Sequence, residues 1–390
     1  MEYALSELFT LQMGKTPSRD NSSYWKKSEN NWISIADLTN SGKYISNTKE
    51  TLSDSAVAES GIKKIPANTV IMSFKLSLGK VAITEKEMYS NEAIMAFIDK
   101  GVEKISPEYL YYLLRAKDWS KGTNKAVMGA TLNKATLSTI KIQLHEYDNQ
   151  LEIVNMLNRV SSSIDFRKQQ LTKLDELVKA RFVEMFGDPI SNPFGFKVKT
   201  LQKMIDDGTI MYHLDGNHGS DYPRNEEFVE CGVPYISANC IVHNDVNLKL
   251  AKHLTEERAS KLRKGIAQNG DVLFAHNATV GPVAILYTDD EKVILGTSLT
   301  AYRCDKERMV PDYLKAYMQS EGFVCQYTKD MKQTTRNQVP ITAQRKFLFV
   351  IPPLSLQNQF ADFAAEVDKS KLFAELFAQS TCILAENHSK

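Results

Sequence analysis

The sequence of 390 residues predicts an α+β protein in which two related domains are joined by two long helices that form an antiparallel coiled coil. Three observations support this prediction: the first half of the chain recurs about 202 positions later, a long segment without Pro or Gly separates the copies, and a similar segment ends the chain. A repeat of this length indicates a duplicated domain rather than a short solenoid unit. The expected boundaries are 1–147 for the first domain, 148–187 for the central helix, 188–354 for the second domain and 355–390 for the C-terminal helix.

The repeat is clearest in two segments. Residues 70–72 (Val-Ile-Met) match 272–274 (Val-Leu-Phe), and residues 79–83 (Gly-Lys-Val-Ala-Ile) match 281–285 (Gly-Pro-Val-Ala-Ile). Later matches depart slightly from the offset of 202 positions. Thr131-Leu132-Asn133 is matched with Thr335-Arg336-Asn337, and Asn149-Gln150 is matched with Asn358-Gln359. Two related domains in one chain imply two related binding events.

Each domain mixes strands and helices, as in the α+β or α/β classes. Gly, Asn and Ser separate short β-like runs at 32–35, 70–74, 80–84 and 93–98, and a helix with Pro near its start is predicted at 107–117. The second domain repeats this plan with strands at 235–237, 271–275, 283–287 and 298–303 and a helix from Pro311. The strand order is left open.

The central segment contains no Pro or Gly from Asp148 to Phe186, and Gly187-Asp188-Pro189 is a typical helix end. Its apolar residues alternate in steps of four and three: Ile153, Leu157, Val160, Ile164, Leu171, Leu174, Val178 and Met185. This spacing is typical of a coiled coil. At about 1.5 Å per residue, the helix would span roughly 58 Å.

The C-terminal segment has the same stepping, with Ser370 and Thr381 filling gaps between Leu356, Phe360, Phe363, Val367, Ala374, Phe377 and Leu384. We expect the two helices to pair antiparallel within the chain; the alternatives are packing of each helix on its own domain, or a dimer. Arg167 and Arg181 interrupt the central seam. They could pair with acidic residues of the other helix or mark a surface for a partner, and control of the helix register is favoured.

Composition is that of an ordinary soluble protein, with 43% hydrophobic and 24% charged residues. The net charge of +1 argues mildly against a nonspecific nucleic-acid coat. No apolar run approaches the roughly 18 residues of a membrane span, and the N-terminus lacks the features of a signal peptide, so a cytoplasmic location is expected. The five cysteines show no CxxC spacing and the seven histidines no paired motif, so neither a metal site nor a disulfide framework is predicted.

Motifs of the common catalytic classes are missing. Gly14-Lys15-Thr16 fails as a P-loop because Phe9 stands where the first glycine is required, and no GxGxxG, GxSxG or HExxH pattern occurs. Asn192-Pro193-Phe194 lacks the second proline of the adenine methyltransferase motif and is interpreted as a linker turn. Carboxylates are numerous enough for a dispersed nuclease triad, although no pattern indicates one. We therefore expect that the chain alone catalyses no reaction.

The layout of domain, long helix, domain, long helix resembles the specificity subunit of type I restriction–modification enzymes over essentially the whole chain. Gly14-Lys15-Thr16-Pro17-Ser18, followed by residues 32–38 (Trp-Ile-Ser-Ile-Ala-Asp-Leu), is similar to the opening of many target-recognition domains. Residues 215–223 and 232–237 are similar to another common opening, and residues 180–189 close the central helix as in that family.

This resemblance implies that each target-recognition domain reads one half of a bipartite double-stranded DNA target, while the paired helices set the spacer and dock two adenine-N6 methyltransferase subunits. Nuclease/translocase subunits would join through them. No cofactor is expected on this chain, since S-adenosylmethionine, ATP and Mg would be used by the partner subunits. The alternatives are a coiled-coil scaffold that binds only protein, which salt-dependent DNA affinity would exclude, and a fused restriction–methylation enzyme, which would transfer methyl groups by itself.

Turn-rich segments of both domains offer the polar and basic side chains that read bases and bind phosphates. The candidates in the first domain are Lys15, Ser18, Arg19, Lys75, Lys80, Asn133 and Lys134. Those in the second domain are His218, Tyr222, Arg224, His276, Asn277, Thr279, Arg336, Asn337 and Gln338.

The most informative pair of segments is 74–80 and 275–281, whose flanking strands match while the enclosed residues differ, as two different half-sites would require. The alternative is a hairpin whose polar residues merely face water. Segments 129–134 and 333–338 come second. Thr131 and Asn133 would suit phosphate positioning, or would cap the turn that follows.

Overall fold

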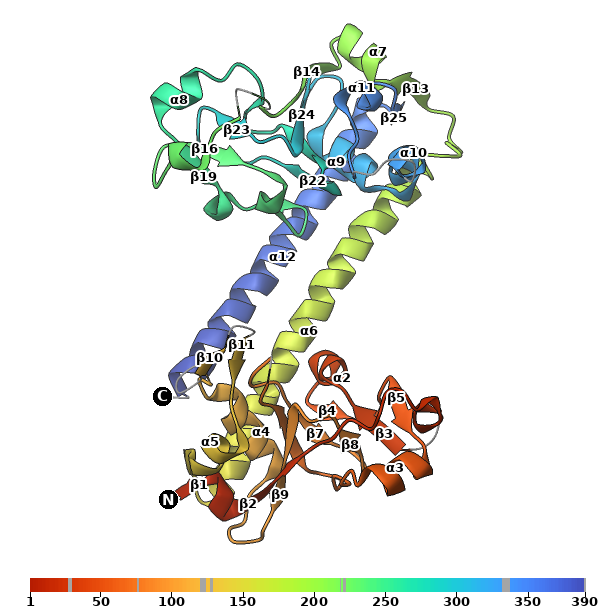
Figure 1. Ribbon diagram of the computed structural model, residues 1–390. Coiled ribbons are helices and arrows are strands. Elements are labelled where there is room, and N and C mark those ends of the chain that lie inside the picture. Colours follow the sequence, from red (N-terminus) through yellow and green to blue (C-terminus); the bar gives the residue numbers. More distant parts are fainter. Residues whose placement is uncertain are drawn as a thin grey trace. The chain divides into compact units, whose positions relative to one another are not determined.

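The computed structural model describes residues 1–26, 30–75, 77–119, 124–126, 129–217, 219, 222–331 and 337–388, with side chains outside 120–131, 329–336 and 375–390 (Figure 1). The protein is a mixed α+β protein with two long helices. It divides into two compact units, formed mainly by Met1–Ser163 and Ile164–Leu384, which are described separately. No helix of the described part of the chain has both the length and the apolar character needed to cross a membrane.

The first unit contains a five-stranded sheet of order β2-β9-β6-β7-β4, a three-stranded sheet of order β5-β3-β8 and two short ribbons, β1-β12 and β10-β11. The strands are β1 (Glu2–Ala4), β2 (Phe9–Met13), β3 (Asn30–Ile33), β4 (Tyr44–Ile45), β5 (Glu50–Leu52), β6 (Val70–Ser73), β7 (Val81–Thr84), β8 (Tyr89–Ser90), β9 (Ile94–Asp99), β10 (Asn124–Ala126), β11 (Gly129–Thr131) and β12 (Lys141–Gln143). The helices are α1 (Leu5–Leu8), α2 (Ile35–Asn40), α3 (Asp54–Ser60), α4 (Pro107–Ala116), α5 (Lys134–Thr139) and the beginning of α6 (Tyr147–Phe186).

Strand β6 is buried at every position, which explains the continuous apolar run at residues 70–72. Val70 and Met72 pack in the core that contains Leu110 and Leu114 of α4, whereas Ile71 faces a second core on the other side of the sheet. A strand buried on both faces needs apolar residues at every position rather than at alternate ones. Helix α4 starts at Pro107, and the Ser106 hydroxyl caps it by accepting a hydrogen bond from the backbone N–H of Tyr109.

The second unit contains a four-stranded sheet of order β14-β24-β21-β22, a five-stranded sheet of order β15-β19-β16-β23-β20 and two ribbons, β13-β25 and β17-β18. The strands are β13 (Lys197–Thr200), β14 (Ile210–Asp215), β15 (Phe228–Val229), β16 (Val233–Ile236), β17 (Ile241–Val242), β18 (Asp245–Val246), β19 (Lys252–Leu254), β20 (Ile266–Ala267), β21 (Val272–Asn277), β22 (Thr279–Ile285), β23 (Val293–Leu295), β24 (Leu299–Cys304) and β25 (Leu348–Ile351). The helices are α7 (Leu201–Asp206), α8 (Glu256–Ser260), α9 (Pro311–Gln319), α10 (Glu321–Met331), α11 (Ile341–Gln344) and α12 (Leu354–His388).

The internal repeat is visible in the strand pairing of the two units. Val70 pairs with Ile83 between β6 and β7, and Val272 pairs with Ile285 between β21 and β22, so both partners are displaced by 202 positions. The neighbouring strand is β9 in the first unit and β24 in the second, which is again an equivalent position. The predicted relationship between the two halves therefore extends to the sheet topology, which the sequence had left open.

A buried glutamine joins each long helix to its own domain. The Gln150 side chain accepts a hydrogen bond from the Ser106 N–H at 3.0 Å, and the Gln357 side chain accepts one from the Val310 N–H at 2.9 Å. Both side chains are almost fully buried. These equivalent residues lie 207 positions apart, so the match of Gln150 with Gln359 was wrong, because Gln359 is exposed on α12.

Helix α6 ends at Phe186 and is followed by Gly187, whose φ of 72° is left-handed, as expected for a glycine that follows a helix. The seam residues of α6 are all half-buried: Ile153, Leu157, Val160, Ile164, Leu171, Leu174 and Val178. On α12, Phe360 and Val367 are buried and Phe363 is half-buried, whereas the side chain of Phe377 lies outside the described residues.

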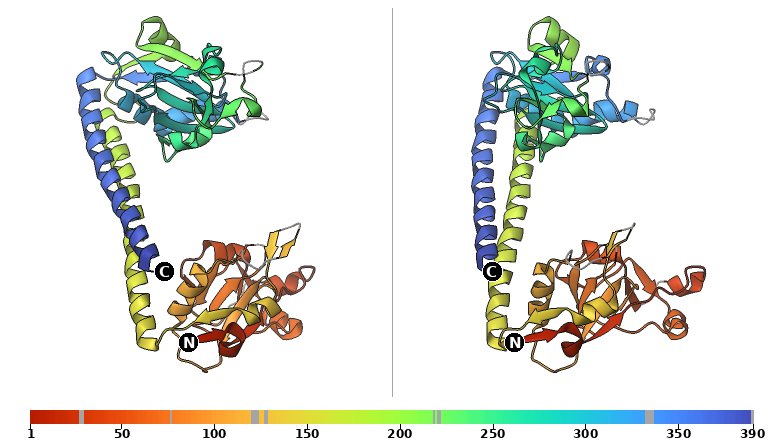
Figure 2. Two further views of the ribbon diagram at one scale, coloured as in Figure 1. Left: turned by 90° about the vertical axis from the view of Figure 1, so that its left-hand side faces the viewer. Right: turned by 60° about the vertical axis from the view of Figure 1, so that its left-hand side comes forward.

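Within the second unit, α6 and α12 pack antiparallel (Figure 2). The rings of Phe182 and Phe360 lie 5.7 Å apart between centroids, and the Asp175 carboxylate pairs with the Lys371 ammonium group at 2.8 Å. Residues with lower numbers on α6 therefore contact residues with higher numbers on α12, as in an antiparallel pair. Ser370, expected in the seam, is exposed instead, and Lys371 occupies the half-buried position because its charge is neutralised by aspartates.

Arg181 does not pair with an acidic residue of the other helix. It forms an ion pair with Glu184 on its own helix at 2.8 Å, and its guanidinium group lies 5.7 Å from the ring centroid of Phe363 on α12. Arg167 donates a hydrogen bond to Gln170 on α6. A cation–π contact of this kind can still favour one register of the helix pair.

Candidate nucleic-acid interface

The tip of the β21–β22 hairpin is bonded to a segment far away in the sequence. The hairpin turns at Ala278, whose φ of 62° is left-handed. The Ala278 N–H donates a hydrogen bond to the Asn337 carbonyl at 3.0 Å, and the Val339 N–H donates one to the His276 carbonyl at 2.8 Å. Between them, Asn277 and Gln338 form an antiparallel β-bridge. Two segments that were proposed separately from the sequence therefore form one backbone ladder.

The first unit has an equivalent connection. The Leu132 N–H donates to the Phe74 carbonyl at 3.0 Å, so Leu132 corresponds to Val339 and the offset between the halves has grown from 202 to 207. Matching Asn133 with Asn337 was consequently wrong. Asn133 caps helix α5, because its side-chain oxygen accepts a hydrogen bond from the Thr136 N–H at 2.7 Å, which is the alternative role that the sequence had allowed.

Side chains with directional hydrogen-bonding groups surround the ladder of the second unit. Thr279, Asn337 and Gln338 are exposed and Asn277 is half-buried. A carboxamide carries both a donor and an acceptor, and this combination can bind the N6 and N7 atoms of adenine in the major groove. The ladder thus presents neutral groups suited to reading base edges.

His276 does not share this exposure. Only 2% of the residue is accessible, and its Nδ1 atom lies 3.1 Å from the Val339 carbonyl. Burial lowers the pKa of the ring, so the neutral form is favoured. This placement argues against His276 as a base-reading residue and makes it part of the support beneath the ladder.

The buried support also contains His213 and Gln344. The Gln344 side chain accepts a hydrogen bond from the Tyr302 hydroxyl at 2.7 Å and lies 3.2 Å from Nε2 of His213, while its amide group donates to Thr300 at 3.1 Å. Burial lowers the pKa of His213 to about 4. The network connects β14, β24 and α11 below the exposed ladder.

The corresponding loop of the first unit is basic. Lys75 and Lys80 are half-buried, and the Lys80 ammonium group donates to the Thr39 hydroxyl at 2.6 Å. Strand β6 already ends at Ser73, whereas its counterpart β21 continues to the tip of the hairpin. The two halves therefore differ in both the backbone and the charge of this loop.

The residues near the start of the chain belong to a compact cluster. Arg19 forms two hydrogen bonds with Glu50, at 2.7 and 3.0 Å, and its guanidinium group stacks 3.6 Å from the ring centroid of Trp25. Lys15 donates to the Ser60 carbonyl at 2.5 Å. A neutralised, stacked arginine suits a structural role, so the Arg19 assignment is weakened, whereas Ser18 is exposed.

The remaining candidates are dispersed. Lys134, Tyr222 and Arg224 are exposed, whereas His218 and Arg336 lie outside the described residues. Within the described part of the chain, no three His, Cys, Asp or Glu side chains come close enough together to hold a metal ion.

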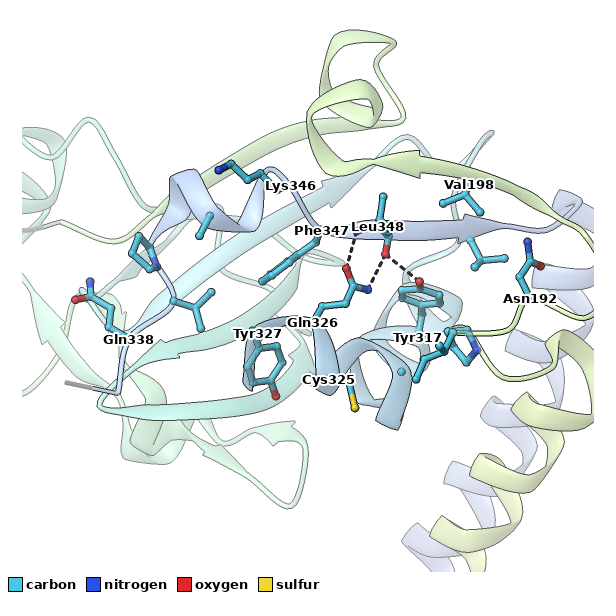
Figure 3. A pocket seen from close by; sticks show the side chains of 17 residues that line it. Asn192, Val198, Tyr317, Cys325, Gln326, Tyr327, Gln338, Lys346, Phe347 and Leu348 are labelled. Atoms are coloured by element: carbon cyan, nitrogen blue, oxygen red, sulfur yellow. Dashed lines mark hydrogen bonds between the residues drawn. The ribbon is translucent and has the colours of Figure 1, made fainter. Parts of the chain in front are cut away.

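A pocket of about 610 Å³ lies between α10, β25 and the segment that follows α6 (Figure 3). Its polar groups are used internally, because Gln326 exchanges hydrogen bonds with the Leu348 backbone at 2.7 and 2.9 Å and the Tyr317 hydroxyl donates to the Leu348 carbonyl at 2.9 Å. The rest of the lining is mainly apolar. This arrangement stabilises the β13–β25 ribbon and shows none of the convergent polar groups of a catalytic site.

The sequence analysis had overlooked exposed aromatic residues on the long helices. Phe166 on α6 is 63% exposed and Phe373 on α12 is 74% exposed. Neither residue belongs to the seam, so a search limited to seam spacing could not find them. A comparison of the two helices at their structural offset would have done so.

The comparisons with known proteins agree with this architecture. Residues 1–176 match the family model described as the type I restriction modification DNA specificity domain. This first part of the chain is thus similar to that specificity domain. Two solved chains have a similar fold. One is the S subunit of a type I restriction-modification system from M. genitalium (TM-score 0.54, 12% identity), and the other comes from a structure on complex assembly and conformational transition of the type I R-M system (TM-score 0.57, 15% identity). Each alignment covers 99% of this chain and 94% of the other.

Curated relatives of this chain carry related names. It is 27% identical over 240 residues to the type I restriction enzyme MjaIX specificity subunit of Methanocaldococcus jannaschii, with 59% of this chain and 55% of the relative covered. It is 29% identical over 189 residues to the HindI specificity subunit of Haemophilus influenzae, with 46% and 40% covered. The chain thus spans about half the length of these curated relatives.

Proposed function

We propose that this protein is the DNA-recognition subunit of a type I restriction–modification complex and that each of its two domains reads one half of a bipartite target. The observation that carries this proposal is the pair of equivalent loop connections, Phe74 to Leu132 and His276 to Val339. Both place two variable segments side by side on a common scaffold. Around one connection the described side chains include Lys75 and Lys80, and around the other they include neutral amides and a hydroxyl. Two similar scaffolds with different chemistry suit two different half-sites.

The division of chemistry follows from this proposal. Base identity would be read by Asn277, Thr279, Asn337 and Gln338 in the second domain, whereas Lys75 and Lys80 would bind phosphates in the first. The chain itself would be non-catalytic, and adenine-N6 methylation, translocation and cleavage would belong to partner subunits that use S-adenosylmethionine, ATP and Mg. The long helices would dock two methyltransferase subunits and set the spacer between the half-sites. Domain boundaries at 147 and 188 and a cytoplasmic location are part of the same proposal.

The deciding experiment is sequencing of adenine methylation in a host that lacks modification and expresses this chain with the methyltransferase subunit of its system. A split motif with methylated adenine in both halves is the expected result. Exchange of residues 1–147 for another such domain should change one half of the motif only. Unmethylated DNA despite a purified complex, combined with no DNA affinity, would exclude the recognition role and leave a protein-binding scaffold.

Replacing both Lys75 and Lys80 by Ala should weaken DNA binding and reduce its salt dependence. If each lysine neutralises one phosphate, the slope of log K against log salt should fall by about 1.8, since each phosphate contact contributes about 0.9. Titrations of fluorescent duplex at several salt concentrations would measure this slope. The double variant Lys63→Ala, Lys64→Ala, on the same domain but outside the candidate residues, is the matched control, and an unchanged slope in the loop variant would remove this loop from the interface.

Adding one heptad to each long helix should change the spacer while leaving the half-site sequences intact. Seven residues lengthen a helix by roughly 10 Å, which is about 3 base pairs of B-DNA. Both helices need the insertion because their antiparallel contacts must stay in register. Methylation sequencing reads the spacer directly, and an unchanged spacer with full activity would contradict the role of the helices as a ruler.

A further inference from the structure

The buried support beneath the ladder has a counterpart of different chemistry in the first unit. Strand pairing defines part of the correspondence, because Tyr302 pairs with His213 as Phe97 pairs with Leu11. The neighbouring strand pairs and the loop connections define the rest. In the second unit the equivalent positions carry buried side chains with hydrogen-bonding groups: His213, His276, Thr300, Tyr302 and Gln344. In the first unit they carry buried apolar side chains of one core, in the same order Leu11, Phe74, Met95, Phe97 and Leu137.

The fold does not require these polar groups. The first unit builds the equivalent strands and the equivalent loop connection around an apolar core. A buried polar group gains little net stability from its hydrogen bonds and loses stability where a bond is missing. Nδ1 of His213 is buried and has no hydrogen-bond partner among the described residues. Stability alone therefore gives no reason for the polar core of the second unit.

The network converges on the backbone of one residue, Val339. Its carbonyl accepts a hydrogen bond from the Gln344 carboxamide at 3.0 Å and lies 3.1 Å from Nδ1 of His276, which donates to it in the Nδ1–H tautomer. The Val339 N–H donates to the His276 carbonyl at 2.8 Å. Gln344 is itself fixed, because the two ends of its carboxamide bond to the hydroxyls of Tyr302 and Thr300. Side chains and backbone together thus hold Val339 in one position.

Val339 directly follows Asn337 and Gln338, the exposed carboxamides of the ladder. A carboxamide that binds the edge of a base through two hydrogen bonds has to be held to within about 0.5 Å of the productive geometry. A lysine that binds a phosphate is a point charge on a flexible stem and tolerates looser placement. A rigid support is therefore needed beneath the amides of the second domain, and an apolar core is sufficient beneath Lys75 and Lys80 of the first.

We propose that His276 and Gln344 are positioning residues for base recognition by the second domain, because they hold the Val339 backbone and thereby place Asn337 and Gln338 against the base edges. This inference rests on the proposed function of the chain. It extends that function by assigning the specificity for one half-site partly to buried residues that touch no base. Recognition of the other half-site does not depend on such a network, since Phe74 and Leu137 stand at the equivalent positions.

The test uses the complex of the full-length chain with the methyltransferase subunit of its system. Methylation sequencing and the exchange of residues 1–147 first assign each half of the motif to a domain. Methyl transfer is then measured on duplexes that carry the motif or a single mismatch in one half, and the ratio of the kcat/KM values gives the discrimination at that half.

His276→Phe and Gln344→Leu introduce the side chains of the first unit. We expect each to lower discrimination at the second half-site by at least ~5-fold and to leave the first half-site within ~2-fold, since a well-placed bidentate contact gives roughly 5- to 150-fold discrimination. His276→Asn is the conservative variant, because its side-chain amide can still donate to the Val339 carbonyl. It should retain most of the discrimination that His276→Phe loses.

Met318→Ala is the matched control for stability. Met318 is fully buried on α9 in the same core as Tyr302, and its side chain forms no bond of the network. Its loss should destabilise the second unit without a selective effect on the second half-site. Urea denaturation of each variant gives the stabilities that are compared.

Three outcomes would overturn the inference and leave the proposed function intact. One is unchanged discrimination at the second half-site in both His276→Phe and Gln344→Leu, and another is an equal loss at both half-sites. The third is an equal selective loss in Met318→Ala at comparable stability, which would trace the effect to unfolding rather than to placement. An unaltered complex that methylates no split motif and has no DNA affinity would instead refute the proposed function itself.

Discussion

Replacing Phe360 by Ala should destabilise the second unit by about 3–5 kcal/mol, the typical loss when a large buried aromatic side chain is removed. Phe360 is fully buried at the start of α12, and its ring lies 5.7 Å from that of Phe182 and 5.6 Å from that of Phe186 between centroids. The substitution removes contacts between the start of α12 and the C-terminal end of α6 and leaves a cavity. The free energy of unfolding is measured by urea denaturation, monitored by circular dichroism.

The matched control on the same helix is Phe373→Ala. Because 74% of Phe373 is exposed, its loss should change the free energy of unfolding by no more than about 0.5 kcal/mol. Equal effects of the two substitutions would mean that α12 does not pack on α6 through Phe360. That result would also remove the basis for assigning helical faces on α12.

The second unit should lose stability when the pH falls below about 6.5, the ordinary pKa of histidine. Burial lowers the pKa of His213 to about 4, and a lowered pKa of His276 adds to the effect. The unfolded chain binds these protons more readily than the folded chain, so stability is full above about pH 6.5 and declines as the pH falls through the folded-state pKa. For His213 alone the loss amounts to about 3 kcal/mol, since each pKa unit corresponds to about 1.4 kcal/mol.

The measurement is the urea midpoint of the protein between pH 7.5 and 4 in steps of half a unit. His213→Gln keeps a side chain that can hydrogen-bond to Gln344 but does not titrate, so this variant should show a smaller acid-induced decline. The half-buried His253→Gln variant serves as a control, because it removes a histidine from β19 outside the buried network. A decline in His213→Gln as steep as in the unaltered protein would show that other groups control the acid response.

Much of the architecture could be predicted from the sequence because its signals are local. A run without Pro or Gly and with four-three spacing predicts a helix such as α6, and the repeated Val-Ile-Met and Val-Leu-Phe segments predict equivalent strands. The register of later matches could not be predicted. The offset grows to 207 before Val339, and α10 has no helical counterpart among the described residues between α4 and α5, so short matches such as Asn133 with Asn337 aligned the wrong residues.

The candidate interface was less predictable, because the composition of a loop does not reveal what its residues contact. His276 and Asn277 are neighbours, yet contact with Val339 buries His276, whereas Asn277 at the end of β21 is half-buried. Arg19 was predicted as a phosphate ligand, but its guanidinium group is bound by Glu50 and stacks on Trp25. Tertiary contacts of this kind have no signature in residue type or spacing.

The backbone ladder between the β21–β22 hairpin and residues 337–339 has a consequence for how this protein can evolve. Its hydrogen bonds join main-chain atoms of residues that are about 60 positions apart, so they do not depend on which side chains stand at Asn277, Thr279, Asn337 and Gln338. Substitutions there can alter the chemistry of the surface while its shape persists. A deletion in either segment would separate the two. Divergence at this edge should therefore proceed by exchange of residues at constant length, with insertions accumulating elsewhere in the domain.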